Sequence, residues 1–170
     1  MLRIVLAIAI LSSNVFAFDY NKFGTVLVAG LAASSFGATL LLDDKEGQKY
    51  YLGTFGANVA TTMVIKYAIN RKRPDGDDYS FPSGHTSVAF QSAAFIHKRY
   101  GFRYAAPMYV AAAVVGYTRI KAKRHYISDV IAGAALGILI GYTIPRRNKD
   151  IMLTAGTNKG LFGVTLFKRW

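Results

Sequence analysis

The sequence predicts an all-α protein, a bundle of about five to six apolar helices. Hydrophobic residues make up 52% of the 170 residues, and glycine and alanine recur through long uncharged stretches, which suits close helix packing in or against a bilayer. Short polar or basic segments containing glycine or proline separate these stretches and stop each helix. Residues 150–170 differ, because they favour strands and could form a C-terminal β-hairpin.

Residues 1–17 precede the main domain, which we expect to span 18–149. They combine a basic residue, Arg3, with an apolar run and a small residue at Ala17, as a secretory signal peptide does. The run is short for a membrane span, so we favour a signal peptide over a first membrane anchor. Either reading sends the chain into the bacterial cell envelope.

The first helix of the main domain is expected at 23–42, a stretch of twenty residues without a charge that is long enough to cross a bilayer. A second helix at 48–71 carries small residues, including Gly53 and Gly56, which predict a tightly packed face. It should end near Arg73, because the proline that follows disfavours helix in the residue before it.

Three more helices are expected at 84–100, 104–118 and 125–144. Ser83 is suited to be the N-cap of the first of them. The last helix carries glycines at four-residue spacing, which let a neighbouring backbone approach closely. These glycines are Gly133, Gly137 and Gly141.

The helix order also makes a prediction about the membrane. If residues 1–17 spanned it, there would be six spans, and the polar clusters described below would all lie outside. The loops at 97–104 and 145–149 would lie inside, and both are basic, as the positive-inside rule expects. The shorter helices could instead rest on the membrane.

The net charge of +12 implies an anionic partner. A nucleic-acid binder usually pairs such charge with polar helices or exposed aromatic platforms, whereas here much of it lies in three clusters, so we expect no nucleic-acid partner. A phosphorylated substrate or an anionic lipid fits better. Since the chain has no cysteine, disulfides and thiolate metal sites are excluded.

The three clusters, at 66–74, 81–85 and 118–129, are expected to converge on a phosphate. They supply three cations, two histidines and one carboxylate: Lys66, Arg73, Arg119, His85, His125 and Asp129. Ser83 and Gly84 open a helix, whose free N–H groups and positive dipole end make an anion site. Arginine can form bidentate hydrogen bonds to phosphate oxygens, and lysine adds a point charge.

His125 and Asp129 are four residues apart, so on a helix their side chains are neighbours. A carboxylate on one imidazole nitrogen fixes the tautomer and leaves the other nitrogen as a nucleophile. His85 can sit opposite and protonate the leaving oxygen. No carboxylate cluster suits a divalent metal, so we expect neither a metal nor another cofactor.

The motifs K-x6-R-P, P-S-G-H and R-x5-H-x3-D resemble the three signatures of the type 2 phosphatidic acid phosphatase (PAP2) family, which shares its site with vanadium haloperoxidases. The resemblance implies a metal-independent phosphatase of lipid phosphates or diphosphates. It implies that His125 forms a phosphohistidine, that Asp129 orients His125, and that His85 is the general acid. It implies a phosphate cradle of five residues: Lys66, Arg73, Ser83, Gly84 and Arg119. The third signature usually begins Ser-Arg, whereas this chain has Thr118 there.

The N-terminal segment and the helix order predict an inner-membrane or periplasmic protein whose active site faces the periplasm. We expect its partners to be a phosphorylated lipid and the membrane. Two rival functions remain: a phosphotransferase to a lipid acceptor, and a non-catalytic membrane protein that binds anionic lipids. Several charges are left outside the site. Arg71 and Lys72 are read as exposed charge, and the acids of the loop as solvated turn residues: Asp75, Asp77 and Asp78. Others are either solvated or attract lipid head groups: Lys121, Lys123 and Arg124.

Overall fold

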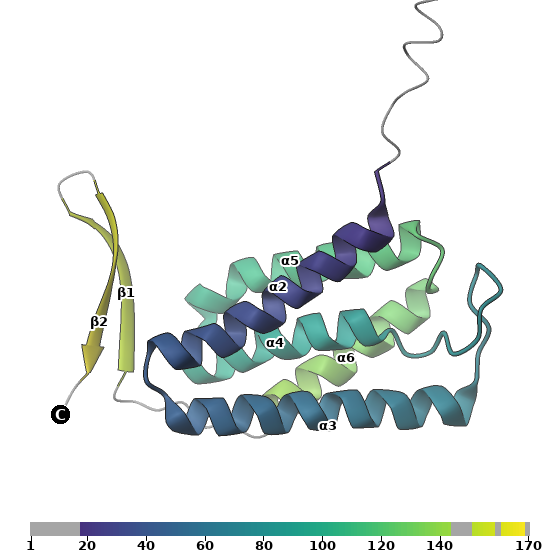
Figure 1. Ribbon diagram of the computed structural model, residues 1–170, viewed down its shortest axis with the longest axis horizontal. Helices are drawn as coiled ribbons and strands as arrows, with labels where there is room; N and C mark the ends of the chain where they lie inside the picture. The colour runs from purple at the N-terminus through teal and green to yellow at the C-terminus, as the bar shows by residue number, and fades with distance from the viewer. Residues whose placement is uncertain (1–17, 144–150, 159–160, 169–170) are drawn as a thin grey trace, which may run out of the picture.

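The computed structural model describes residues 18–143 together with the backbone of two C-terminal strands (Figure 1). The described part contains five helices: α2 (Tyr20–Leu41), α3 (Lys45–Ile69), α4 (Gly84–Tyr100), α5 (Phe102–Lys121) and α6 (Ile127–Thr143). Strands β1 (Ile151–Asn158) and β2 (Leu161–Lys168) pair antiparallel, with Ile151 opposite Lys168. The prediction of an all-α bundle is confirmed. The expected signal peptide or anchor at 1–17 and the basic loop at 145–149 lie outside the described residues.

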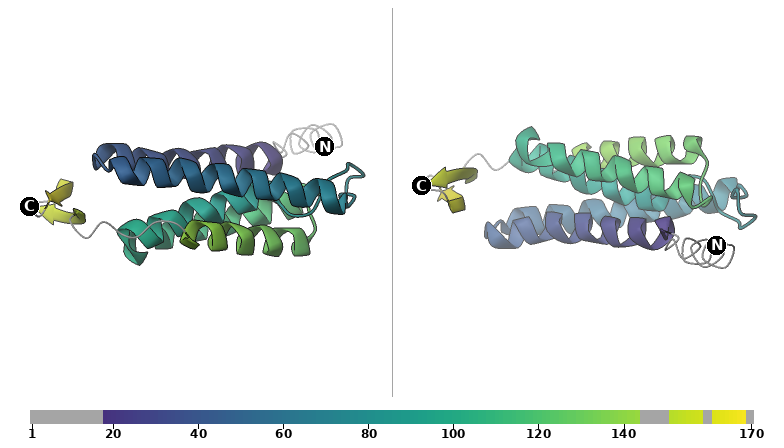
Figure 2. Two further views of the ribbon diagram at one scale, coloured as in Figure 1. Left: turned by 90° about the horizontal axis from the view of Figure 1, so that it is seen from below. Right: turned by 90° about the horizontal axis from the view of Figure 1, so that it is seen from above.

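Helix α4 is the central element of the bundle and contacts each of the other four helices. Figure 2 shows α2 and α3 together on one side of the molecule and α5 and α6 on the opposite side. The predicted N-cap of α4 is confirmed, because the Ser83 side chain accepts a hydrogen bond from the backbone N–H of Thr86. The start of α4, which carries the second motif, is therefore held by its N-cap and by the packing of the helix against its neighbours.

The glycines of α6 let that helix approach the backbone of α4, as the spacing predicts. A Cβ atom built on Gly137 would lie 2.2 Å from the carbonyl oxygen of Ser87, and one built on Gly133 would lie 2.5 Å from that of Ser83. Real side chains do not tolerate such contacts with backbone. The glycine ridge therefore sets the position of α6, and with it the position of Asp129, relative to the start of α4.

Helix α3 does not pack through its glycines, so that prediction is wrong. A Cβ atom on Gly53 or Gly56 would meet nothing within 4 Å. The buried face consists instead of Tyr51, Thr54, Asn58 and Thr62, together with Gly47 near the start of the helix. Polar side chains on this face bond to α4: the Ser87 hydroxyl donates to Asn58 Oδ1 at 2.6 Å. Hydrogen bonds between side chains, rather than small residues, hold α3 against α4.

At the opposite end of the bundle from the three motifs, a buried ion pair ties the α2–α3 turn to the end of α4. The Arg99 guanidinium donates to both carboxylate oxygens of Asp44. Asp44 also accepts a hydrogen bond from Tyr100 Oη at 2.8 Å and caps α3 through the N–H of Gly47 at 2.9 Å. Both oxygens of the Asp44 carboxylate thus accept hydrogen bonds from the α2–α3 turn and from the end of α4.

Two helix boundaries near the motifs differ from the prediction. Helix α3 stops at Ile69, because Asn70 adopts a left-handed conformation with φ 44°, which asparagine tolerates better than most residues. Helix α6 begins at Ile127, so His125 lies in the loop before it rather than on the helix. Arg73 consequently does not share a helix face with Lys66.

Among the described residues, α2 is the one helix long and apolar enough to cross a bilayer, with a mean hydropathy of 1.6. Helix α6 is apolar too but shorter. The expectation of a membrane span at 23–42 therefore agrees with the length and composition of α2.

Candidate active site

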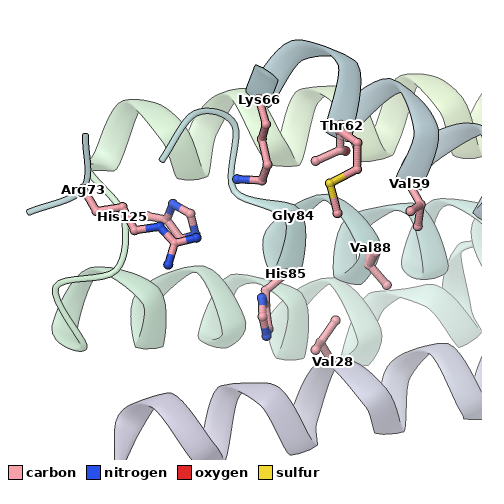
Figure 3. Close-up of a pocket in the computed structure, with 10 residues that line it drawn as sticks. Val28, Val59, Thr62, Lys66, Arg73, Gly84, His85, Val88 and His125 are labelled. Atoms are coloured by element: carbon pink, nitrogen blue, oxygen red, sulfur yellow. The ribbon is translucent and has the colours of Figure 1, made fainter. Parts of the chain in front are cut away.

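The three motifs meet at one end of the bundle, where α3 and α5 end and α2, α4 and α6 begin (Figure 1). A cavity of about 370 Å³ opens there. Its polar side is formed by residues from all three motifs, as Figure 3 shows: Lys66, Arg73, Gly84, His85 and His125. The structure thus brings five of the eight predicted site residues to one cavity, although they lie in segments that extend from Lys66 to His125 along the chain.

The other side of the cavity is apolar. Valines and a methionine from three helices line it: Val28 of α2, Val59 and Met63 of α3, and Val88 of α4. Figure 3 shows the three valines beyond the histidines, on the side away from Arg73. The cavity is therefore divided into a cationic part and an apolar part.

His125 is buried in the loop before α6, with its Nδ1 atom turned towards two groups. Nδ1 lies 3.5 Å from the hydroxyl oxygen of Ser80 and 3.8 Å from Oδ2 of Asp129. The carboxylate is close, as predicted, but it does not bond directly to the ring, because His125 precedes the helix that carries Asp129. The ring also lines the cavity, and its opposite nitrogen, Nε2, has no part in these contacts.

The surroundings of His125 favour the neutral ring. Burial, together with the positive charges of Lys66 and Arg73, lowers the pKa of His125 to about 3, and the charge of Asp129 opposes this shift only in part. A neutral imidazole keeps the lone pair that a nucleophile needs. The two cations of the cavity therefore help to keep the His125 ring neutral.

Asp129 is completely buried, and each of its oxygens has a partner. Oδ2 accepts hydrogen bonds from the Ser80 hydroxyl at 2.5 Å and from the N–H of Tyr126 at 2.9 Å, while Oδ1 pairs with Arg71 Nη1 at 3.0 Å. Arg71 is exposed and outside the cavity lining, as predicted, but it also pairs with this buried carboxylate, which the sequence did not indicate.

His85 and Lys66 both have partners around the cavity. The Nε2 atom of His85 lies 3.2 Å from the hydroxyl of Thr25, at the start of α2. The Lys66 ammonium donates to the carbonyl oxygen of Tyr79 at 2.7 Å and so holds the loop that precedes α4. Neither Thr25 nor Tyr79 belongs to a recognisable motif, so these contacts could not be predicted from the sequence.

Arg73 carries a donor suited to an anion. Its backbone N–H bonds to the carbonyl of Asp77 at 2.7 Å, and its Nη1 atom is 3.8 Å from the Asp77 carboxylate. Its Nε atom is buried without a hydrogen-bond partner among the described residues. A buried donor of this kind is costly unless an acceptor reaches it, and a phosphate oxygen is such an acceptor.

Arg119 and Ser83, both predicted phosphate ligands, do not line the cavity. Arg119 is buried in the last turn of α5 and donates to the side chain of Asn21 at 3.0 Å and to its carbonyl oxygen at 2.7 Å. Gly24 permits this contact, because a Cβ atom there would lie 2.2 Å from Arg119 Nη2. The Ser83 hydroxyl is buried against Thr86. A role for either residue in binding phosphate stays a prediction.

The acidic loop between α3 and α4 is not simply solvated. Arg124 Nη1 donates to Asp75 at 2.8 Å and to Asp77 at 2.9 Å, which joins this loop to the one before α6. Asp77 also faces Arg73. The acids and Arg124 therefore hold together the two loops that deliver Arg73 and His125. In the part of the chain that the structure describes, no three His, Cys, Asp or Glu side chains are grouped to hold a metal ion.

Comparisons with known proteins agree with this arrangement. The family model described as PAP2 superfamily matches residues 75–152. Phosphatidylglycerophosphatase B of Bacillus subtilis is 30% identical over 142 residues, which covers 69% of this chain and 70% of that protein. Lipid A 1-phosphatase of Porphyromonas gingivalis is 48% identical over 80 residues, 45% of this chain.

Two solved structures have a similar fold. The crystal structure of Aquifex aeolicus LpxE has a TM-score of 0.54 and 28% identity, and the match covers 68% of this chain and 81% of that one. The PAP2 type phosphatidylglycerolphosphate phosphatase from Bacillus subtilis has a TM-score of 0.51 and 28% identity, over 72% and 67% of the two chains.

The curated relatives are not matched to the same extent. The aligned region spans 18% of the length of the Porphyromonas gingivalis protein and half of the length of a lipid A 1-phosphatase from Rhizobium etli. The Bacillus subtilis relative, in contrast, is matched over more than two thirds of its length. With the three motifs gathered around one cavity in a helical bundle, this match shows that the chain belongs to the PAP2 superfamily.

Proposed function

We propose that this chain is a phosphatase that hydrolyses a lipid phosphate or lipid diphosphate without a metal, through a phosphohistidine on His125. The observation that carries the proposal is the divided cavity, which places two histidines and two cations next to an apolar wall. Relatives named lipid A 1-phosphatase and phosphatidylglycerophosphatase B support a lipid substrate.

The reaction would proceed in two steps. In the first, Nε2 of His125 attacks phosphorus and forms a P–N bond, the bond to the leaving oxygen breaks, and His85 gives that oxygen a proton. Burial and the nearby cations lower the pKa of His85 to about 4, so His85 would hold this proton only once the negative charge of the bound phosphate offsets those cations. In the second, neutral His85 takes a proton from water, whose oxygen attacks phosphorus as the P–N bond breaks. Inorganic phosphate leaves, and both imidazoles return to their starting protonation states.

The transferring phosphoryl group carries its charge on three oxygens, so catalysis needs fixed positive groups around it. Arg73 offers the buried Nε donor, and Lys66 offers an ammonium group. Gly84 lies at the cavity at the first turn of α4, where N–H groups without helical partners point outwards. These donors are in place before the substrate arrives, which is what electrostatic stabilisation of the reaction requires.

The apolar part of the cavity suits the acyl end of the substrate. Val28, Val59, Met63 and Val88 would contact the first part of a lipid tail while the phosphate lies among the cations. We therefore propose a substrate with an acyl chain close to its phosphate, of the kind on which phosphatidylglycerophosphatase acts, or a lipid A phosphate.

The test is phosphate release by the purified full chain in detergent, with excess chelator and a panel of phosphatidic acid, phosphatidylglycerol phosphate, undecaprenyl diphosphate and lipid A. We expect turnover with at least one of these, inhibition by vanadate, and a loss of at least a thousandfold in kcat for His125→Ala. His97→Asn is the matched control, because His97 lies outside the cavity and contacts Tyr109 and Tyr142.

Three results would contradict the proposal. Full activity of His125→Ala would show that His125 is not the nucleophile, and loss of activity in chelator would show that the reaction needs a metal. Binding of these lipids without turnover would favour the non-catalytic lipid-binding alternative. Transfer of phosphate to an added alcohol in preference to water would favour a phosphotransferase.

We further propose that the cavity opens to the periplasm of a bacterial inner membrane. Because the chain has no cysteine, single cysteines can report on each end of the bundle. Asp78 is exposed in the loop beside the cavity, and Lys45 is exposed at the α2–α3 turn. In cells whose outer membrane is permeabilised, a membrane-impermeant maleimide should label Asp78→Cys and spare Lys45→Cys. The reverse pattern would overturn the orientation.

A further inference from the structure

We propose that Ser80 is a positioning residue, whose hydroxyl transmits the effect of the Asp129 carboxylate to the His125 ring. The inference rests on the proposed function, because it assigns His125 the role of nucleophile. Ser80 lies outside the three motifs that identify the family, in the loop just before the second of them.

The distances among the three groups support a relay. The Ser80 hydroxyl oxygen lies 2.5 Å from Oδ2 of Asp129 and 3.5 Å from Nδ1 of His125. The direct distance from Nδ1 to Oδ2 is 3.8 Å, beyond hydrogen-bond range. A hydroxyl has one proton to donate and lone pairs to accept, so Ser80 can donate to the carboxylate and accept the Nδ1–H of the ring.

Ser80 is fixed in this position by contacts on both sides. It is completely buried, and its N–H donates to the carbonyl oxygen of Arg71 at 2.6 Å. Arg71 in turn pairs with the second oxygen of Asp129, at 3.0 Å. The carbonyl oxygen of Ser80 accepts a hydrogen bond from the Lys66 ammonium at 3.4 Å. The backbone around Ser80 is therefore bonded both to the residue that holds Asp129 and to a cation of the cavity.

This geometry has a consequence for the reaction. When Nε2 of His125 attacks phosphorus, positive charge develops on the ring, and Nδ1–H becomes a stronger donor. The Ser80 oxygen receives that hydrogen bond while its own proton points at the negative charge of Asp129. No proton is transferred among the three groups, because the hydroxyl only orients the ring and couples it electrostatically to the carboxylate.

A serine with a purely structural role could also donate a hydrogen bond to a buried carboxylate. Kinetic measurements distinguish this structural role from the positioning role. Removing a positioning group should lower kcat and leave KM almost unchanged, because it acts on the attack and not on binding. Removing a structural hydrogen bond should lower thermal stability and leave the turnover of the folded protein unchanged. The matched control is Ser92, a fully buried serine of α4 whose hydroxyl lies 3.0 Å from Tyr51 Oη, outside the cavity.

The experiment compares wild type, Ser80→Ala and Ser92→Ala in detergent, with a lipid phosphate that wild type turns over. We expect kcat to fall at least tenfold in Ser80→Ala with KM within twofold, while Ser92→Ala keeps kcat within twofold. In single turnovers, acid-labile phosphate should appear on Ser80→Ala at least tenfold more slowly. A kcat within twofold of wild type, or an equal loss in Ser92→Ala, would overturn the proposal.

His125→Ala, measured in the same series, separates this inference from the proposed function. If His125→Ala is inactive and Ser80→Ala has the kcat of wild type, the phosphatase function is supported and the positioning role of Ser80 is refuted. If wild type itself releases no phosphate from any lipid in the panel, both fall.

Discussion

Replacing Gly137 with alanine should destabilise the bundle, although alanine is the better helix former. The glycine lies in the middle of α6, where a Cβ atom would be 2.2 Å from the carbonyl oxygen of Ser87 and 2.8 Å from the backbone nitrogen of Gln91. Both contacts are with the backbone of α4, which cannot rotate away as the end of a side chain can. The two helices would therefore have to move apart.

The size of the effect follows from the contact distances. Real Cβ atoms essentially never approach closer than 3.0 Å, so α6 must retreat from Ser87 by about 0.8 Å. Overpacking of this kind costs about 1–3 kcal/mol, and two backbone contacts place Gly137 in the upper part of that range. Helix propensity returns about 1 kcal/mol. The net loss should be about 2 kcal/mol, or roughly 4–8 °C in the melting temperature of a chain of this size.

The assay is thermal unfolding followed by circular dichroism at the helix band, with all variants in the same detergent. Gly53→Ala is the matched control, because a Cβ atom there would meet nothing within 4 Å, so this change should leave the melting temperature equal to or above that of wild type. If Gly137→Ala melts within a degree of Gly53→Ala, the close approach of α6 to α4 is wrong.

Three further substitutions probe other parts of the molecule. Burial and neighbouring cations lower the pKa of His125 in the folded protein to about 3, whereas the ordinary pKa of histidine is 6.5. Between these two values the unfolded chain binds more protons than the folded one, so the free energy of unfolding should decrease as the pH falls from 6.5 towards 3. Urea titrations should show this decrease, and a smaller one in His125→Asn. Arg99→Ala should lower the free energy of unfolding by about 3–5 kcal/mol, since it leaves the buried Asp44 carboxylate without its cation; an equal loss in the double variant Arg99→Ala/Asp44→Asn, which keeps neither charge, would contradict that reason. Arg124→Ala breaks ion pairs that are partly exposed to solvent, and should change the same free energy by less than about 1 kcal/mol.

Sequence reasoning located the helices and the cavity residues because local rules govern both. Apolar stretches, the N-cap at Ser83 and the four-residue glycine spacing depend on neighbours along the chain. The predicted helix ends near Asn70 and His125 were less accurate. At Asn70 a left-handed conformation ended the helix four residues before the proline that was expected to do so.

Most of the contacts that sequence reasoning missed join segments far apart along the chain. Ser80 meets Asp129, and Arg71 meets the same carboxylate, across more than forty residues in each case. A serine in a loop has no pattern that reveals such a partner. Arg119 shows the converse, because its motif suggests a phosphate ligand while its guanidinium is bonded to the start of α2 at Asn21.

The buried pair of Asp44 and Arg99 lies at the end of the bundle away from the cavity, joining the α2–α3 turn to the end of α4 (Figure 1). Variants there should reduce how many molecules persist in the cell while each surviving molecule works at its normal rate. A growth defect caused by substitutions at this end of the bundle would therefore reflect a low abundance of the protein, and overexpression should reverse it. Overexpression should not reverse a growth defect caused by substitutions in the cavity.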